Sequence, residues 1–231
     1  MPKKIIFVIV EGPSDDDSLG IFFDNYYDAY DVKVEVMHCD ITTTKGVTTT
    51  NILSKVAEVV KEYAVNNHLK KECFKEIIHI VDTDGVYVSD NLIVEDGSLK
   101  ETVYSLDSIK CKNKNHIIKR NEQKRRNIDK LINCGHVWTS IPYKMYYMST
   151  NLEHVLHNIQ NATDDEKEEL AYQFLKKYKN DLNDFINYIC NSSFSINDEY
   201  LNSWTFIKQG NNSLNRYTNL CLCFNSNQET K

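Results

Sequence analysis

The chain has 231 residues, of which 41% are hydrophobic, 26% charged and 11% aromatic, with only 7 Gly and 3 Pro. This composition excludes disordered, collagen-like and repeat-array proteins, and the length suits one domain with an elaboration or two small domains. The longest uninterrupted apolar run covers residues 5–10, far fewer than the roughly 20 that cross a bilayer. We therefore expect a cytoplasmic protein that does not insert into a membrane.

The formal net charge of −6 is unevenly distributed. Residues 110–130 contain nine basic and two acidic side chains, so this segment carries +7 and the remainder carries −13. A basic segment attached to an acidic body is typical of proteins that contact polyanions.

The seven cysteines are dispersed and include no CxxC pair. A disulfide framework usually has an even number of cysteines in a smaller, loop-rich chain, and a zinc site needs paired ligand spacings. The pattern therefore predicts free thiols.

The first half of the chain alternates predicted strands and helices. Residues 5–10 form a continuous β-branched run, which predicts a strand buried on both faces. Ser14 is placed to cap a helix that ends near Tyr30 and Asp31, and strict alternation then predicts a strand over 32–39. A helix capped by Asn51 and a third strand at 77–81 follow. This order predicts an α/β fold with a mainly parallel sheet.

The second half begins with the basic segment, which interrupts the alternation as an insertion over about 105–133 and is helical around 117–132. Strand-like composition resumes at 137–148, and residues 151–159 resemble a short helix. We therefore divide the chain into an α/β domain, 1–160, and a mostly helical C-terminal extension, 161–231.

Three predicted strands end in acidic residues. Glu11 follows the first, Asp40 the second, and Asp82 and Asp84 the third, while Asp15 lies one helical turn past Glu11. The carboxyl ends of parallel strands share one sheet edge, where such carboxylates repel one another unless a cation neutralises them. Mg²⁺ prefers oxygen ligands and substrate phosphates, so the pattern favours phosphate chemistry. For Asp40 alone we expect solvent or a loop hydrogen bond.

Glu11-Gly12 after the first strand and Asp82-x-Asp84 after a later one resemble the TOPRIM domain, shared by topoisomerases, primases and several nucleases, over about residues 4–90. Asp15 makes the pattern more similar to the nuclease branch, notably the OLD (overcoming lysogenization defect) family and related phage-defence proteins. The resemblance implies a Rossmann-like TOPRIM fold and a Mg²⁺- or Mn²⁺-dependent endonuclease, acting in antiphage defence or as a toxin.

The resemblance also implies roles for single residues. Glu11 would be a general acid/base or metal ligand, and Asp82 and Asp84 would hold the catalytic metal. Asp15 and Glu153 would complete a second metal site, although Glu153 suits an ordinary helix carboxylate equally well. Nucleic-acid contacts are expected from the basic residues Lys119, Arg120, Lys124, Arg125, Arg126, Lys45 and Lys144, the last two of which are also candidates for a catalytic lysine.

Two side-chain groups have competing interpretations. Tyr143, Tyr146 and Tyr147 are suited to stack on bases, but core packing is the commoner use. His154 and His157 have a spacing that suits a metal, but a surface or core-edge pair is favoured.

Rival functions remain open on the sequence. Asp82 to Gly85 also resembles the DxDG loop of haloacid-dehalogenase phosphatases, although that loop normally ends the first strand. OLD proteins fuse the nuclease to an ATPase, but this chain has no GxxxxGK[ST] loop, so it acts alone, as an oligomer, or with an ATPase on a separate chain. A third hypothesis is that the chain is a non-catalytic TOPRIM-like module that docks onto such an ATPase.

Overall fold

The computed structural model describes residues 3–28, 30 and 32–225, so the predicted helix end at Asp31 lies outside the described residues. The chain forms two compact units, each built from three segments. Unit 1 comprises Met1–Val81, Arg126–Tyr146 and Ala171–Phe185, and unit 2 comprises Asp82–Arg125, Tyr147–Leu170 and Ile186–Lys231. The predicted division at residue 160 stays a prediction.

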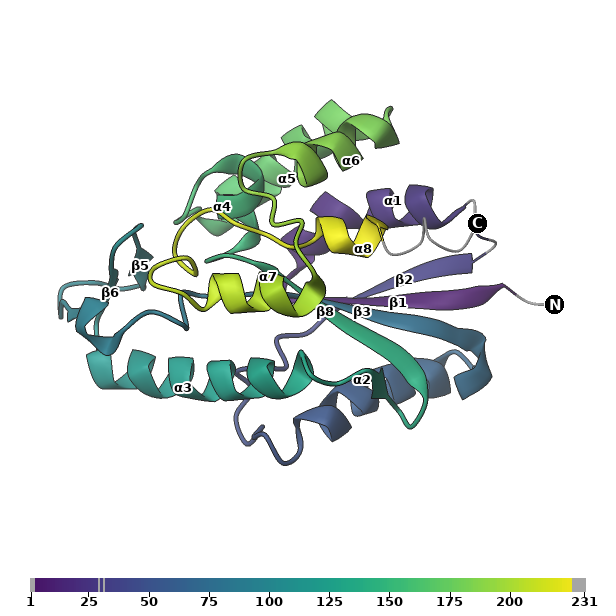
Figure 1. Cartoon of the computed structure of the whole chain (residues 1–231), viewed down its shortest axis with the longest axis horizontal. Coiled ribbons are helices and arrows are strands. Elements are labelled where there is room, and N and C mark those ends of the chain that lie inside the picture. Colours follow the sequence, from purple (N-terminus) through teal and green to yellow (C-terminus); the bar gives the residue numbers. More distant parts are fainter. Residues whose placement is uncertain (1–2, 29, 31, 226–231) are drawn as a thin grey trace. The chain divides into compact units, whose positions relative to one another are not determined.

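Unit 1 is organised around a five-stranded sheet with the order β2-β1-β3-β8-β7 (Figure 1). β1 pairs in parallel with both β2 and β3, and Ile9 lies opposite Met37 on one side and His79 on the other. β7 and β8 pair antiparallel, so the sheet is mixed but mostly parallel. This confirms the predicted α/β class. The strands are β1 (Lys4–Val10), β2 (Val32–His38), β3 (Phe74–Asp82), β7 (His136–Val137) and β8 (Ile141–Met148).

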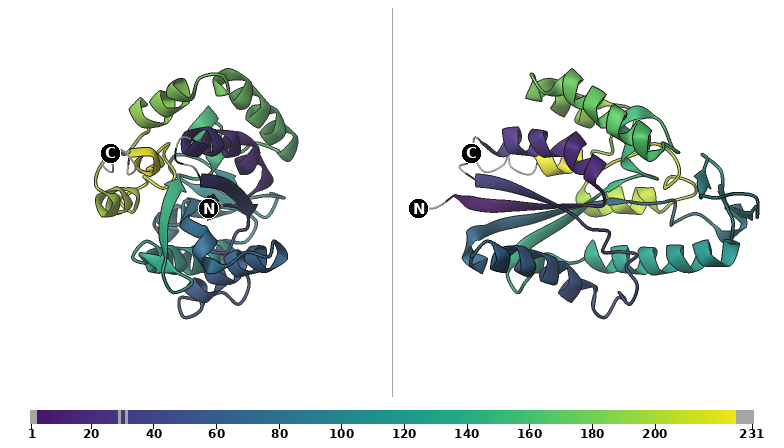
Figure 2. Two further views of the ribbon diagram at one scale, coloured as in Figure 1. Left: turned by 90° about the vertical axis from the view of Figure 1, so that its right-hand side faces the viewer. Right: turned by 180° about the vertical axis from the view of Figure 1, so that it is seen from behind.

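Helices α1 (Pro13–Asp28) and α2 (Ile52–Asn66) cover opposite faces of this sheet (Figures 1 and 2). β1 is buried on both faces because a helix lies over each, as its continuous apolar run predicts. On α1, Phe22 stacks on Phe185 with ring centroids 4.0 Å apart and meets the edge of Phe174 at 5.8 Å. Aromatic packing therefore joins α1 to the third segment of unit 1.

Asn51 stands at the N-cap of α2, as predicted, but its side chain does not cap the helix. Its Oδ1 accepts a hydrogen bond from the Thr48 backbone N–H at 2.8 Å, and its Nδ2 donates to the Gly46 carbonyl at 3.0 Å. The expectation of a side-chain cap is therefore wrong, because the preceding loop offers this amide closer partners.

The remaining helices agree with the predicted basic helix and the mostly helical C-terminal third. They are α3 (Lys114–Leu131), α4 (Leu152–His157), α5 (Asp164–Tyr178), α6 (Leu182–Asn191), α7 (Tyr200–Ile207) and α8 (Cys221–Asn225), with short 3₁₀ turns η1 (Lys71–Cys73) and η2 (Asp90–Leu92). Within the described residues, no helix combines the length and apolar character needed to span a bilayer.

Unit 2 contains a small three-stranded sheet that the sequence does not predict. Its strands β4 (Ile93–Glu95), β6 (Ile109–Cys111) and β5 (Val103–Tyr104) are adjacent in that order. Ile93 and Ile109 pack with Leu214 in one buried cluster. Strands of two or three residues are too short to show a period of two, which is why the pattern missed them.

A tight turn follows β3 at the start of unit 2. The Val86 N–H donates to the Thr83 carbonyl at 2.9 Å, and the two residues between them have positive φ, +49° at Asp84 and +65° at Gly85. This is the pattern of a type I′ turn. The Thr83 and Asp84 N–H groups donate to the Met148 and Thr150 carbonyls at 2.8 and 2.9 Å, which fixes the turn against the end of β8.

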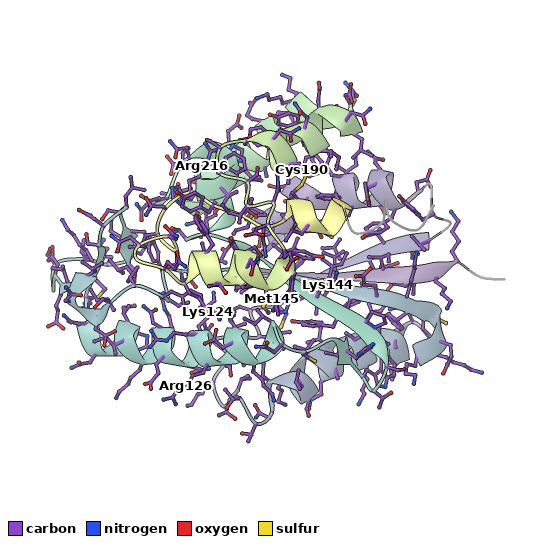
Figure 3. All side chains as sticks on the ribbon, viewed as in Figure 1. Lys124, Arg126, Lys144, Met145, Cys190 and Arg216 are labelled. Atoms are coloured by element: carbon purple, nitrogen blue, oxygen red, sulfur yellow. A yellow bond between two sulfur atoms is a disulfide. The ribbon has the colours of Figure 1, made fainter. Side chains whose placement is uncertain are left out.

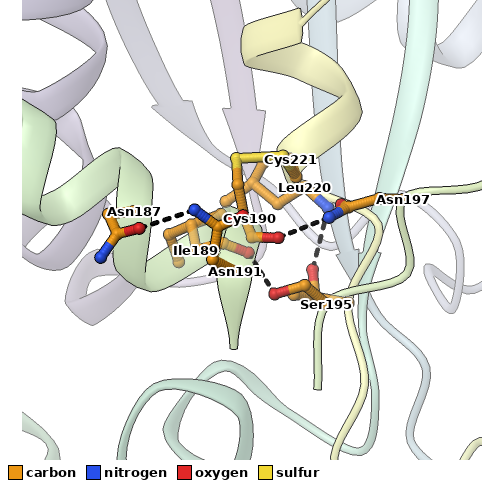
Figure 4. Close-up of a disulfide and its surroundings, with 9 residues drawn as sticks. Asn187, Ile189, Cys190, Asn191, Ser195, Asn197, Leu220 and Cys221 are labelled. Atoms are coloured by element: carbon orange, nitrogen blue, oxygen red, sulfur yellow. Dashed lines mark hydrogen bonds between the residues drawn. A yellow bond between two sulfur atoms is a disulfide. The ribbon is translucent and has the colours of Figure 1, made fainter. Parts of the chain in front are cut away.

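A disulfide joins Cys190, near the end of α6, to Cys221, the first residue of α8, with Cα atoms 4.9 Å apart (Figure 4). The Asn197 side-chain amide donates to the Cys190 carbonyl and the Ser195 hydroxyl to the Ile189 carbonyl, so side chains brace the segment around the bond. The prediction of free thiols is wrong for this pair, because cysteines separated by 31 residues leave no spacing signal. It holds for Cys39, Cys73, Cys111 and Cys134.

Gly85→Ala tests the turn. A Cβ at Gly85 would lie 2.6 Å from Leu214 Cδ2 at a φ of +65°, so we expect a loss of about 2 kcal/mol or more in the free energy of unfolding. Gly97→Ala is the matched control, because nothing lies within 4 Å of its added Cβ. Urea denaturation measures both, and equal effects would contradict the packing described here.

Candidate functional site

The carboxyl ends of two neighbouring strands carry the predicted acids. β1 and β3 run parallel with Ile9 opposite His79, so both strands end at the same sheet edge. Glu11 directly follows β1, and Asp82 is the last residue of β3. Both side chains are half-buried. The topology therefore brings the carboxyl ends of β1 and β3 to the same edge of the sheet.

Asp15 supports the main chain at Glu11. Its Oδ2 accepts hydrogen bonds from the N–H groups of Glu11 at 3.1 Å and Gly12 at 2.9 Å, and the residue is only 7% exposed. An acid in the first turn of α1 also suits the positive end of the helix dipole. Asp15 thus fixes the path of the chain where β1 passes into α1.

Asp40 accepts hydrogen bonds from residues of its own loop, as predicted. Its Oδ1 accepts from the N–H and hydroxyl of Thr42 at 3.1 and 3.0 Å and from the N–H of Thr43 at 3.2 Å. This acid therefore organises the turn after β2.

Asp84 is ion-paired inside unit 2. Lys124 Nζ lies 2.5 Å from its Oδ2, and the Tyr104 hydroxyl donates to its Oδ1 at 3.2 Å. Burial acts to raise the pKa of Asp84, but the Lys124 ammonium and Arg120 guanidinium, together with the hydrogen bonds, bring that pKa below its ordinary value. Asp84 is therefore ionised and compensated by the protein's own cations.

The basic residues of α3 divide between the interior and solvent. Lys124 is fully buried, and Arg120 donates to the Tyr104 hydroxyl at 2.9 Å and to the Asp84 carbonyl at 3.2 Å. The half-buried Arg125 donates to the Val86 carbonyl at 3.4 Å. Lys119 and Arg126 are exposed, and Figure 3 labels Lys124 and Arg126 on opposite sides of the helix. Only part of the predicted basic set is therefore accessible to a polyanion.

The exposed cations form one face of α3. Lys119, Arg126 and Lys130 are spaced by seven and four residues, which places them on one side of a helix. We call these three residues the basic stripe. Sequence reasoning did not separate them from Arg120 and Lys124, although helical phase carries that signal.

The other two predicted lysines are exposed as well. Lys45 lies in the loop after β2, and Lys144 lies on β8. Burial raises the pKa of Glu76, and the charges of Lys144 and Lys75 oppose that rise. Lys144 therefore has an acidic neighbour in its own unit.

Helix α4 buries Glu153 and His154, which are 3% and 1% exposed. Asn151 caps this helix by accepting from the His154 N–H at 2.8 Å. Burial and the nearby Arg216 guanidinium lower the pKa of His154 to about 4, so this side chain is neutral at pH 7. The expectation of a surface or core-edge pair is thus wrong for His154, which is buried, while His157 is half-buried.

The three tyrosines of β8 pack in the core, the favoured interpretation. Tyr143, Tyr146 and Tyr147 are 2%, 1% and 0% exposed. Tyr143 shares a hydrogen bond of 2.8 Å with His79 Nδ1, and Tyr147 meets Trp204 edge to face with centroids 5.0 Å apart. In these positions they support the sheet.

Few side chains in the described part of the chain are grouped in a way that suits metal binding. Within residues 3–28, 30 and 32–225, no three His, Cys, Asp or Glu side chains gather into a group that would hold a metal ion. Mg²⁺, however, is commonly held by one or two carboxylates, with waters and substrate phosphates as its other ligands. Glu11 and Asp82 each carry the carboxylate oxygens that such an ion prefers.

Comparison with known proteins identifies no relative. No protein-family model, curated protein or solved structure matches the chain. The TOPRIM resemblance therefore depends on the residues themselves, above all on Glu11, Asp82 and Asp84.

His154 makes the stability of the protein depend on pH. The unfolded state takes up a proton near pH 6.5, whereas the folded state does so near pH 4, so stability falls as pH falls between these values. We expect His154→Phe to flatten this part of the profile, measured by urea denaturation from pH 4 to pH 7.5. His116→Gln, an exposed histidine on α3, is the control. A profile unchanged by His154→Phe would contradict the assignment.

Proposed function

We propose that the chain is a metal-dependent nuclease that hydrolyses nucleic-acid phosphodiesters. The observation that carries the proposal is the parallel pairing of β1 with β3, which gives Glu11 and Asp82 neighbouring strands that end at one sheet edge. Ligands of open α/β sheets bind at this edge. The proposal includes the Rossmann-like TOPRIM fold that the sequence resembles.

Glu11 and Asp82 would hold the ion, Mg²⁺ or Mn²⁺. Once bound, such an ion polarises a phosphoryl oxygen and lowers the pKa of its water. Asp15 contributes by hydrogen-bonding the N–H groups of Glu11 and Gly12, which orients the loop that carries Glu11. Asp15 and Glu153 remain the proposed ligands of a second ion.

The basic stripe would contact the phosphate backbone. Seven residues of a helix span about 10 Å, so Lys119 and Arg126 are spaced to reach separate phosphates along one strand. Lys45 and Lys144, also exposed, are proposed as further contacts. A cytoplasmic location, a role in antiphage defence or as a toxin, and an ATPase partner on a separate chain complete the proposal.

A second candidate is the non-catalytic module. The ion pair between Asp84 and Lys124 favours it, because an acid of the DxD motif here has a structural partner. The phosphatase has no comparable support, since its motif normally ends the first strand and this one ends β3.

Cleavage assays with a panel of plasmid, single-stranded DNA and total RNA test the nuclease. We expect cleavage in Mg²⁺ or Mn²⁺ that is abolished by chelator. Glu11→Gln and Asp82→Asn should each lower the rate by about 10²-fold or more. Asp90→Asn, an exposed acid nearby in the sequence, is the control that should retain full activity.

The alternatives predict different results. Activity on a small phosphoester that survives Glu11→Gln would replace the nuclease with the phosphatase. If the wild-type chain cleaves nothing, alone or with its cellular partners, the result would support the non-catalytic docking module instead.

The basic stripe makes binding sensitive to salt. Neutralising Lys119, Arg126 and Lys130 with Gln should reduce the slope of log K against log[salt] by about 2 to 3 for double-stranded DNA. The control replaces Lys70, Lys176 and Lys179, which are exposed elsewhere, with the same change in charge. Fluorescence anisotropy across a salt series measures both, and identical slopes would exclude the stripe as the contact surface.

A further inference from the structure

Both carboxylate oxygens of Asp84 have a partner from the chain. Its Oδ2 lies 2.5 Å from Lys124 Nζ, and its Oδ1 accepts from the Tyr104 hydroxyl at 3.2 Å. The Lys124 side chain is 0% exposed, so no water competes for its ammonium. Each oxygen of this carboxylate, whose side chain is 23% exposed, therefore has a partner within unit 2.

A second cation completes the surroundings. Arg120 donates to the Asp84 carbonyl at 3.2 Å and to the Tyr104 hydroxyl at 2.9 Å, and its guanidinium also bonds Asn121 Oδ1 at 2.7 Å. Lys124 and Arg120 are thus both close enough to act electrostatically on the Asp84 carboxylate. A divalent cation brought to Asp84 would meet repulsion from both.

The backbone prevents Asp84 from turning away. The residue occupies the tight turn at φ +49°, and its N–H is held by the Thr150 carbonyl at 2.9 Å. The Thr83 hydroxyl donates to the Ser213 carbonyl at 3.0 Å and accepts from the Thr150 N–H at 3.0 Å. Reaching a metal ion would require breaking the ion pair, because the main chain is fixed.

We propose that Asp84 is a positioning residue that acts as counter-ion to Lys124 and Arg120, and that the metal ion is bound without it. The inference rests on the proposed nuclease, since it concerns which of that enzyme's acids hold the ion. Asp82 and Asp84, although two positions apart in one motif, then have separate tasks. Asp82 binds the ion, and Asp84 fixes two cations of α3.

Mn²⁺ titration of the full chain, followed by electron paramagnetic resonance of the free ion, separates the two acids. We expect Asp82→Asn to weaken binding by at least about tenfold and Asp84→Asn to leave the Kd within about twofold of wild type. The two variants make the same chemical change and are each other's control. Equal weakening in both would overturn the inference while leaving the proposed nuclease intact. A wild-type chain that binds no Mn²⁺ would overturn both.

Asp84→Asn leaves the buried Lys124 ammonium without its partner and can destabilise the fold. The double variant Asp84→Asn/Lys124→Met removes this ammonium as well, so that both side chains are neutral. It should bind Mn²⁺ as wild type does, and loss of binding in the folded double variant would assign the ion to Asp84.

Lysine acetylation of the wild-type chain gives a second readout. An N-hydroxysuccinimide ester should modify the exposed Lys119 with and without Mn²⁺, while Lys124 stays protected in both conditions. Modification sites are read by mass spectrometry. Exposure of Lys124 on adding Mn²⁺ would mean that the ion has displaced its ammonium from Asp84, and would overturn the inference.

Discussion

Burying a lysine ammonium costs several kcal/mol unless a carboxylate compensates it, and in unit 2 that carboxylate is Asp84. The pair depends on the turn that presents Asp84. This turn requires glycine at position 85, because an added Cβ would lie 2.6 Å from Leu214 Cδ2. Leu214 also belongs to the buried hydrophobic cluster that packs against the small sheet. One ion pair therefore connects the end of β3, the inner face of α3 and the core of unit 2. Removing the Asp84 carboxylate would cost about 3–5 kcal/mol, because the Lys124 ammonium would stay buried and charged.

The acids at the strand ends serve different physical purposes despite their similar positions in the sequence. Asp40 and Asp15 satisfy backbone N–H groups, and Asp84 neutralises cations. Glu11 and Asp82, which end neighbouring parallel strands, are the acids on which the proposed chemistry depends. In the proposed nuclease, one motif of several carboxylates would thus contain both the metal ligands and the groups that hold their loops in shape.

Much of the fold could be predicted because long elements have strong periodicity. The continuous apolar run of β1, the alternation in β2 and the helical spacing of α3 each specify an element and its burial. The small sheet has strands too short to show a period, and the bond between Cys190 and Cys221 has no sequence signal. For the site, residue type identified acids and cations, but it could not tell which cations point inward. Helical phase separates Lys124 from Arg126, whereas the pairing of Lys124 with Asp84, 40 residues away, is a property of the folded chain.

The disulfide between α6 and α8 makes the covalent state of the C-terminal region a variable of the surroundings. It joins cysteines 31 positions apart and closes a loop that includes α7. Restricting such a loop in the unfolded chain is worth about 3.7 kcal/mol. Glutathione and thioredoxin keep most cytosolic thiols reduced, so in that compartment the segment would rely on noncovalent contacts such as the packing of Trp204 against Tyr147. The same polypeptide would then have two stabilities, one for each redox environment, and preparations made with and without reductant would behave as different materials.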